Sequence, residues 1–339
     1  MTISRRSVLG AALAAVPAMN ISGIARAAEK TDVIVVGGGF SGLFAAMTLQ
    51  DAGARVTVLE GSGRVGGRAY TGDHIYGRPE LGASQIGPYY ARVRYVAERL
   101  GVELAAGSNI NAPFAYSVRG ELIAKQDWES HPLNDTVGEE RGRLPSTLLG
   151  HYLNKHNPFA ELDQWLQPEA MQYDMPLGDW LVANGASPGA LRLISEGLVP
   201  NSLSRVSLLT LLQEDARGRL LSGTDTDSGK DRFERAALQS SRVVGGTSRL
   251  PEAMAAHLGD AVRTGSPVSH IKTGREGVEI QCLNGQRYKG DFAIAAAPFG
   301  ALRRITIEPA LTGNQAAAVT RMPYANNTQV HLRITGAPF

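Results

Sequence analysis

Runs of consecutive apolar residues, separated by glycine-rich turns, mark the first folded part of the chain. Val33–Val36 is continuously apolar and β-branched, and Arg55–Leu59 repeats that character a short distance later. Such runs are typical of parallel strands that are buried on both faces. Because the intervening segment Gly42–Gln50 has the length of a helix, the pattern predicts a strand–helix–strand unit in a parallel sheet.

A second group of strand patterns lies in the last third of the chain. Apolar and polar residues alternate over residues 278–282, which predicts a half-buried strand. Asn284-Gly285 predicts a hairpin turn directly after it. Phe292–Ala297 is fully apolar and ends at Pro298, so it predicts a further strand. Together these segments predict an antiparallel meander inserted into the doubly wound sheet.

A strand-to-helix junction precedes the meander. Arg242–Val244 predicts a short strand that ends at Gly245-Gly246. The side chains of Thr247 and Ser248 can cap the following helix, which we expect to run to about Leu258.

The middle of the chain, residues 113–239, carries helical patterns and polar turns. Ser187–Leu198 and Ser207–Leu221 are the clearest predicted helices, and Arg92–Leu100 is a shorter one before this region. Clustered leucines predict a buried helix face at Leu208, Leu209, Leu211 and Leu212.

Glycines after the first strand have the spacing of a dinucleotide-binding loop. Gly37 permits a tight turn, Gly39 lets a diphosphate approach the backbone, and Gly42 lets the helix pack closely. The helix N-terminus then points its N–H groups at the diphosphate. Glu60, at the end of the second strand, is placed to accept both ribose hydroxyls and disfavours a 2′-phosphate. The pattern predicts an ADP-containing dinucleotide, but it does not separate NAD from FAD.

The residues that follow carry a resemblance to a known family. LEGSGRVGGRAYT, residues 59–71, resembles the arginine-and-glycine segment of the flavin-dependent monoamine oxidase family, which includes amine, polyamine and L-amino-acid oxidases. ELGASQIGP, residues 80–88, looks like the segment that runs beside the flavin ring in that family. Three later stretches match in family order: VVGGTSRLPEAM (243–254), SPVSHI (266–271) and AIAAAPFGALRRITIEP (293–309).

The resemblance implies FAD as cofactor and assigns residues to it. It places Arg64 near the adenosine and diphosphate and Arg68 nearer the flavin; the alternative is that either arginine only pairs with a surface carboxylate. The backbone of Val268 would meet the adenine, although its side chain could equally be core. The implied cofactor-binding residues are Gly37, Gly39, Phe40, Ser41, Gly42, Glu60, Gly61, Arg64, Gly67, Arg68, Gly82, Ala83, Ser84 and Val268.

The expected fold class is α/β. The chain of 339 residues exceeds the usual size of a single core, so we expect two domains. The resemblance implies a two-domain, Rossmann-like FAD-binding fold with an inserted antiparallel meander and a mixed α+β substrate domain. The predicted FAD-binding domain comprises residues 28–112 and 240–298, and the predicted substrate domain comprises 113–239 and an incomplete part, 299–339.

The reaction implied by the resemblance is oxidation of an amine C–N bond to an imine by hydride transfer to flavin N5. The expected partners are a small-molecule amine and oxygen or another electron acceptor. Many relatives place a lysine near the flavin. Aligning on Pro298 and Pro309 puts Arg304 at that position, and a shift of one residue puts Arg303 there. We therefore expect either a site without the lysine-held water or an acceptor other than oxygen.

Two alternatives remain open at this point. Relatives continue beyond the position of Phe339, so the sequence resembles the first part of an amine oxidase. It could then be a non-catalytic fragment, or half of a split enzyme that a C-terminal partner chain or a homo-oligomer completes. The second alternative is a related flavoprotein, such as a carotenoid desaturase or a porphyrinogen oxidase.

The N-terminal segment, residues 1–27, reads as a twin-arginine signal peptide. Arg5-Arg6 precedes a modest apolar run, and Ala25-Arg26-Ala27 offers a small-x-small cleavage site, so we expect a periplasmic or secreted protein. Its removal takes away three arginines and no acid, which turns the formal charge of +2 slightly negative. No basic stripe remains to indicate nucleic-acid binding.

The cysteine and metal-ligand patterns predict neither an internal disulfide nor a metal site. Cys282 is the single cysteine, which excludes an internal disulfide, and its alternation with apolar neighbours predicts a core position. Asp225, Asp227 and Asp231 resemble part of a calcium loop but lack the glycine and glutamate that such a loop requires. We therefore expect a solvated loop there and no metal site.

Overall fold

The computed structural model describes residues 29–87, 90–106, 115–197, 202–222, 240–324 and 328–333. The predicted signal peptide at 1–27 and the aspartate-rich loop at 225–231 lie outside the described residues. Across the described residues, no helix is both long and apolar enough to cross a membrane.

The described α-helices are α1 (Phe40–Asp51), α2 (Ala91–Arg99), α3 (Leu148–His156), α4 (Leu177–Ala183), α5 (Pro188–Gly197), α6 (Leu208–Ser222), α8 (Arg249–Leu258), α9 (Phe299–Leu302) and α10 (Gly313–Arg321). The strands are β1 (Glu29–Val36), β2 (Val56–Leu59), β3 (Leu104–Ala106), β4 (Ala115–Val118), β5 (Glu121–Ala124), β6 (Ser241–Val243), β7 (Val262–Arg263), β8 (Val268–Gly274), β9 (Gly277–Cys282), β10 (Arg287–Ala295) and β11 (Thr306–Glu308). Both predicted strands of the first unit and the helix between them are confirmed.

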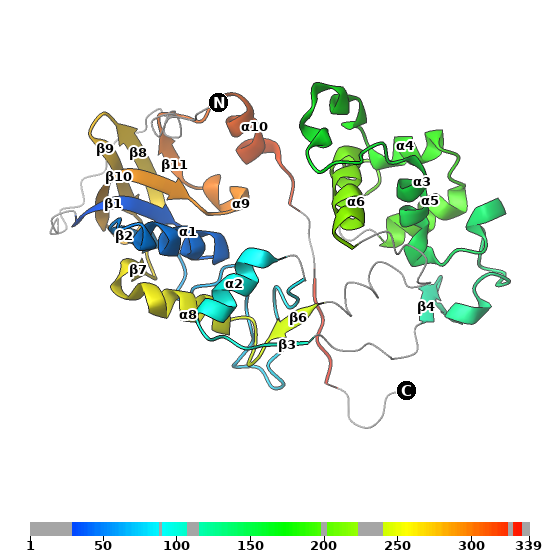
Figure 1. Cartoon of the computed structure of the whole chain (residues 1–339), viewed down its shortest axis with the longest axis horizontal. Coiled ribbons are helices and arrows are strands. Elements are labelled where there is room, and N and C mark those ends of the chain that lie inside the picture. Colours follow the sequence, from blue (N-terminus) through cyan, green and yellow to red (C-terminus); the bar gives the residue numbers. More distant parts are fainter. Residues whose placement is uncertain are drawn as a thin grey trace.

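A seven-stranded sheet forms one lobe, at the left of Figure 1, in the order β11-β8-β9-β10-β1-β2-β7. β1 is parallel to both β10 and β2, with Val33 opposite Phe292 on one side and Val56 on the other. β8, β9 and β10 are antiparallel neighbours. The predicted meander is therefore present, and its last strand is at the same time a parallel neighbour of β1.

The sheet is covered on the side of α1 and α8. Val35 and Val58 are fully buried against Leu43 of α1 and Leu250 of α8. Side chains of the intervening residues, such as Ile34, pack into a second core with β8 and β9. The sheet is thus buried on both faces at β1, as its unbroken apolar run predicts.

Cys282 lies in the second core, as its alternation predicts. It is 1% exposed, and burial raises the pKa of its thiol to about 11. The neighbouring strand β10 begins at Arg287, before the predicted start at Phe292, because its polar first half pairs with β9 across the Asn284-Gly285 hairpin. Phe292 itself is 43% exposed despite its apolar surroundings in the sequence.

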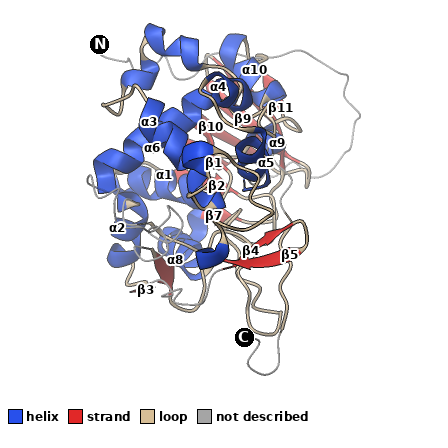
Figure 2. Ribbon diagram, turned by 90° about the vertical axis from the view of Figure 1, so that its right-hand side faces the viewer, coloured by secondary structure: helices blue, strands red, loops and turns tan. Residues whose placement is uncertain are grey.

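The second lobe, at the right of Figure 1 and in front in Figure 2, consists of the helices between β4 and β6. Its own core contains Trp128, Leu177, Leu208 and Leu212, each 1% exposed or less. The leucine face of the predicted helix 207–221 is confirmed in α6. The division of the chain at residue 298 stays a prediction, although β11, beyond that point, pairs with β8 in the sheet of the first lobe.

Candidate cofactor-binding site

The three glycines after β1 have three different environments. Gly37 has φ +114° and donates to the carbonyl of Leu59 at 2.8 Å. A Cβ on Gly42 would lie 1.9 Å from the carbonyl oxygen of Gly37, so α1 packs against the turn only with glycine there. A Cβ on Gly39 would meet nothing within 4 Å, and its φ of −79° suits any residue. The chain itself therefore gives no reason for glycine at 39, whereas a ligand close to the backbone does.

The N-terminus of α1 also lies at Gly39. Gly39 is its N-cap residue, no side chain caps it, and no acid stands in its first turn. Leu43 makes the first intrahelical bond, to the carbonyl of Gly39. The N–H groups of Phe40, Ser41 and Gly42 belong to the first turn, whose donors have no intrahelical acceptor and suit an anion.

Glu60 is fixed at the end of β2 by backbone and hydroxyl donors. Its Oε2 accepts from the N–H of Gly38 at 2.7 Å, and its Oε1 accepts from the N–H and the hydroxyl of Ser62, both at 2.8 Å. A carboxylate has about four acceptor positions, and these three bonds leave about one for a ribose hydroxyl.

The segment that leads to β8 runs beside Glu60. Ser266 donates its N–H to the carbonyl of Glu60 at 2.8 Å, and a Cβ on Gly61 would approach Cα of Pro267 to 3.4 Å. Val268 follows directly and contributes its side chain to the second core. The side chain of Val268 therefore takes the core position that was its alternative role, and contact of its backbone with the adenine stays a prediction.

The arginine-and-glycine loop returns to the glycine turn. Gly66 donates to the carbonyl of Gly38 at 2.8 Å, and a Cβ on Gly67 would lie 3.5 Å from Cα of Gly39. Gly66 and Gly67 have φ values of +100° and +55°. Gly66 and Gly67 therefore lie in a turn that packs against the backbone of the glycine turn.

The two arginines of this loop differ. The guanidinium of Arg64 donates to the carbonyls of Val65, Gly67 and Ala69 at 2.9–3.3 Å and lies 4.0 Å from the ring centre of Tyr70. It holds its own loop together and, among the described residues, pairs with no carboxylate. The Arg68 side chain is exposed and has no hydrogen bond or ion pair within the described part of the chain. Arg68 is thus the cation of this loop that is available to a ligand.

A hairpin joins the arginine loop to the next predicted flavin segment. Ala83 donates to the carbonyl of Arg68 at 3.0 Å, and Leu81 donates to the carbonyl of Tyr70 at 2.8 Å. A Cβ on Gly82 would lie 2.0 Å from the carbonyl oxygen of Arg68, so hairpin packing requires glycine at 82. Ala83 and Ser84 are exposed at the open end of the hairpin.

Sequence reasoning missed Arg94 of α2. Its guanidinium donates to the carbonyls of Ile86 and Gly87 at 3.2 and 3.1 Å and to the hydroxyl of Ser241 at 3.1 Å. Ile86 and Ser241 also exchange both backbone hydrogen bonds at 2.8 Å. Arg94 therefore fixes the end of the segment that resembles the flavin-ring contact, and no local motif marks it.

The predicted capping of α8 is wrong. Ser248 is its N-cap residue, but neither Thr247 nor Ser248 makes a side-chain cap. The hydroxyl of Ser248 accepts from the backbone N–H of Thr71 at 2.9 Å. Acceptors on the hairpin bind the N–H groups of Thr247 and Ser248 instead, because the hairpin packs against this helix end.

The sequence model of a family described as flavin containing amine oxidoreductase matches residues 40–338. The chain belongs to this family. Flavin-containing amine oxidase B of Bos taurus is 28% identical over 313 residues, which are 87% of this chain and 55% of that protein. An L-amino-acid oxidase of Siganus canaliculatus is 28% identical over 317 residues, which are 88% of this chain and 56% of that protein.

Solved structures of amine oxidases share the fold of this family member. Cyclohexylamine oxidase from Brevibacterium oxydans has a TM-score of 0.68 and 25% identity, and a putrescine oxidase bound to putrescine has a TM-score of 0.66 and 24% identity. Each match covers 86% of this chain and 63% of the other. The chain spans about half the length of the curated relatives it matches.

The cofactor of this flavin-containing amine oxidoreductase is FAD, and its residues fit that group. The open space at Gly39 admits a diphosphate, the remaining acceptor position of Glu60 suits a ribose hydroxyl, and Arg68 offers a cation without a partner among the described residues. Within the described ranges there is no group of three or more metal-ligating side chains.

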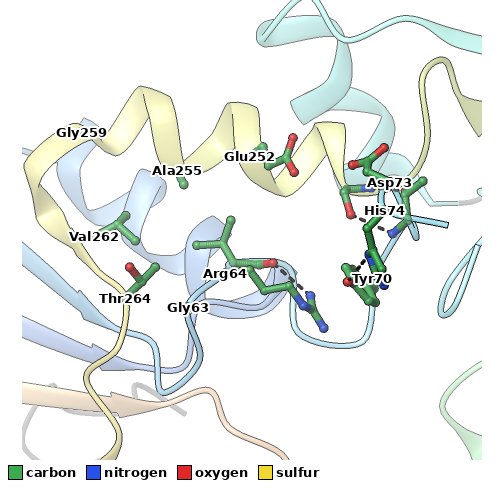
Figure 3. A pocket seen from close by; sticks show the side chains of 13 residues that line it. Gly63, Arg64, Tyr70, Asp73, His74, Glu252, Ala255, Gly259, Val262 and Thr264 are labelled. Atoms are coloured by element: carbon green, nitrogen blue, oxygen red, sulfur yellow. Dashed lines mark hydrogen bonds between the residues drawn. The ribbon is translucent and has the colours of Figure 1, made fainter. Parts of the chain in front are cut away.

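A cavity of about 630 Å³ lies between α8 and the loop that carries Arg64 and Tyr70, as Figure 3 shows. Gly39 and Glu60 do not line it, but Arg64, which the resemblance places near the adenosine and diphosphate, does. Asp73 lines its edge, and a hydrogen bond from Arg78 lowers the pKa of that carboxyl below its usual value. Glu80 lines a second cavity of about 410 Å³, and Thr71 lines both cavities.

The arginines at the position of the family lysine have separate environments. Arg303 donates through Nε to the carbonyl of Val319 at 2.5 Å and through a terminal nitrogen to that of Met322, so it binds the C-terminal end of α10. The Arg304 side chain is exposed and has no such partner in the described part of the structure. Arg303 therefore has a structural role at the end of α10, whereas the side chain of Arg304 is available for another role.

Proposed function

We propose that the whole protein is an FAD-dependent oxidoreductase that oxidises the C–N bond of a small-molecule amine to an imine. The observation that carries the proposal is the open cradle at Gly39, where the N-terminus of α1 and the carboxylate of Glu60 converge. Membership of the amine oxidoreductase family supports the choice of an amine as substrate.

Bound FAD would supply the chemistry, because its ring accepts a hydride from the carbon next to the amine nitrogen. The chain's part is to bind and orient. Glu60 and the N-terminus of α1 would hold the nucleotide half, and Arg68 with the hairpin end at Ala83 and Ser84 would lie against the flavin half. Molecular oxygen or another acceptor would reoxidise the flavin; an arginine in place of the family lysine fits either a site without the lysine-held water or an acceptor other than oxygen.

We further propose export through the twin-arginine pathway to the periplasm or beyond. Arg5-Arg6 and the small-x-small segment Ala25-Arg26-Ala27 support this. The pathway accepts folded proteins, which suits a protein that binds its cofactor before export. Changing both arginines of the pair to lysine should retain the precursor in the cytoplasm, as cell fractionation would show; unchanged export would contradict the assignment.

Anaerobic flavin bleaching tests the reaction. The protein, expressed from its complete gene and loaded with FAD, is mixed with primary, secondary and cyclic amines and with L-amino acids in the absence of oxygen. Loss of the oxidised-flavin absorbance near 450 nm, together with imine-derived aldehyde or ketone, supports the proposal. A fully loaded protein that no amine bleaches would contradict it.

A further inference from the structure

Buried hydroxyl-bearing residues and one half-buried carboxylate join the hairpin to α8. Thr71 and Glu80 lie opposite each other on the hairpin, and Thr247 and Ser248 form the start of the helix. Glu80 Oε1 accepts from the N–H of Thr247 at 2.8 Å, and Thr71 Oγ1 accepts from the N–H of Ser248 at 3.1 Å. The hairpin thus supplies the acceptors that a helix N-terminus needs.

The bonds within this group have a fixed direction. Thr71 donates its backbone N–H to the hydroxyl of Ser248 at 2.9 Å, and Thr71 Oγ1 lies 3.0 Å from Glu80 Oε2. Because Thr71 Oγ1 already accepts from Ser248, its own proton is directed to Glu80. A carboxylate serves here as an acceptor on both oxygens, which an amide does not.

The three hydroxyl-bearing residues of the group are buried, whereas Glu80 is half-buried and lines the second cavity. Thr71 is 2%, Thr247 5% and Ser248 7% exposed. No cation within the described residues lies at ion-pair distance from Glu80. The partial positive charge at the N-terminus of α8 is therefore its nearest electrostatic partner. Thr71 is closely packed against the start of α8, because a Cβ on Gly246 would lie only 2.5 Å from Thr71 Oγ1.

The group lies three residues along each hairpin strand from the candidate flavin contacts. The same hairpin strands carry Arg68 on one side and Ala83 on the other, and these two residues are bonded to each other at 3.0 Å. Backbone hydrogen bonds from Leu81 to Tyr70 and from Ala83 to Arg68 connect the two segments, so a shift of the hairpin relative to α8 displaces both candidate contacts.

We propose that Thr71 and Glu80 are positioning residues for FAD. By capping α8 from the hairpin, they hold Arg68 and the segment from Gly82 to Ser84 at a fixed place on the nucleotide-binding lobe. The role rests on the proposed function, because it requires that these residues contact the flavin half of the cofactor. It concerns affinity and the surroundings of the flavin ring, and neither residue touches the substrate.

The test compares Thr71→Val, Thr71→Ser and Glu80→Gln in the full chain. Thr71→Val keeps the shape but removes the hydroxyl, whereas Thr71→Ser keeps the hydroxyl. Glu80→Gln can still accept from the N–H of Thr247 but cannot also accept the proton of Thr71. Thr48→Val is the matched control, because its hydroxyl donates to the carbonyl of Phe44 on the exposed side of α1. Apoprotein is titrated with FAD by fluorescence, and visible circular dichroism is recorded at saturating FAD.

We expect Thr71→Val and Glu80→Gln to weaken FAD binding about tenfold and to change the visible circular dichroism, since each leaves a buried group unpaired. Thr71→Ser and Thr48→Val should match the unaltered chain. Affinities within twofold and an unchanged dichroism in both impaired variants overturn the positioning role, even if their apoproteins melt earlier. If Thr71→Val does not fold, Glu80→Gln decides. Failure of the unaltered chain to bind FAD would overturn the cofactor assignment as well, so the two failures are distinguishable.

Discussion

The carboxylate of Glu60 accepts a hydrogen bond from the backbone N–H of Gly38 at 2.7 Å. This bond links the end of β2 to the turn after β1. It therefore fixes the ribose-binding group relative to the helix N-terminus that would bind the diphosphate. Two further donors from Ser62 hold the other oxygen, so the carboxylate is oriented before any ligand arrives. Preorganisation of this kind lowers the entropy that binding has to overcome.

Substitution of Glu60 should weaken FAD binding in a graded way. Glu60→Ala removes a charged acceptor, and each hydrogen bond to such a group contributes about 1.5–3 kcal/mol. We expect at least a tenfold loss of FAD affinity in a fluorescence titration and a smaller loss for Glu60→Asp. Equal affinity in all three proteins would show that the ribose does not bind at Glu60.

Arg94 should control how firmly the flavin segment is held. Arg94→Ala removes the donors to the carbonyls of Ile86 and Gly87 and to the hydroxyl of Ser241. We expect faster release of FAD, measured by stopped-flow fluorescence. Arg94→Lys should be intermediate, because a lysine cannot reproduce the planar fork. The control is Arg99→Ala, on the same helix as Arg94, which removes an exposed ion pair with Asp51 of α1. Release at the same rate from both alanine variants would exclude a specific effect of Arg94.

Glu140 should make the helical lobe sensitive to acid. It is 5% exposed and accepts from Tyr152 and from the N–H and hydroxyl of Ser187, at the start of α5. Burial raises the pKa of Glu140, but the hydrogen bonds from Ser187, Tyr152 and Val137 outweigh it and hold the pKa below the ordinary 4.5.

A folded-state pKa below the unfolded value means that the charged form stabilises the fold. That contribution is complete above about pH 4.5 and is lost as the pH falls through the lower folded-state value. Glu140→Gln should therefore lower the urea midpoint at pH 7 and make it depend less on pH between 5 and 3. The exposed neighbour Glu139→Gln is the control. An unaltered pH profile in Glu140→Gln would exclude this source of acid sensitivity.

The adjacent arginines 303 and 304 should respond differently to substitution. Arg303 binds carbonyls at the end of α10, so Arg303→Ala should lower the thermal midpoint by leaving them unpaired. Arg304→Ala should leave it unchanged. Calorimetry of the two apoproteins checks this, and an equal effect of both substitutions would contradict the separate roles.

The sequence predicts the glycine turn and its carboxylate well because they depend on local geometry. The tight turn at Gly37 and the close contact at Gly42 follow from spacing alone. Contacts between distant segments are different. Serine is a residue type that commonly caps helices, but the hydroxyl of Ser248 accepts instead from the backbone N–H of Thr71, 177 residues away in the sequence. Only tertiary packing decides between these partners.

The same distinction explains the arginines. Both Arg64 and Arg68 fit a phosphate or a flavin by residue type, and no sequence pattern shows that Arg64 binds its own loop. Arg94 is part of a helix whose sequence gives no indication that it binds the carbonyls of Ile86 and Gly87. Its role depends on the pairing of Ile86 with Ser241, which lies 155 positions further along the chain and follows from the fold rather than from a motif.

The most direct test of the account is the FAD affinity of Gly39→Val. A Cβ at 39 would meet no protein atom within 4 Å, whereas one at 42 would overlap the carbonyl of Gly37. We therefore predict that Gly39→Val leaves the thermal midpoint of the apoprotein close to that of the unaltered chain but weakens FAD binding at least about tenfold, since the side chain keeps the diphosphate away from the N–H donors of the first turn. Gly42→Ala should instead lower the midpoint. If Gly39→Val binds FAD as tightly as the unaltered chain, the diphosphate does not lie at Gly39 and the assignment of this site is wrong.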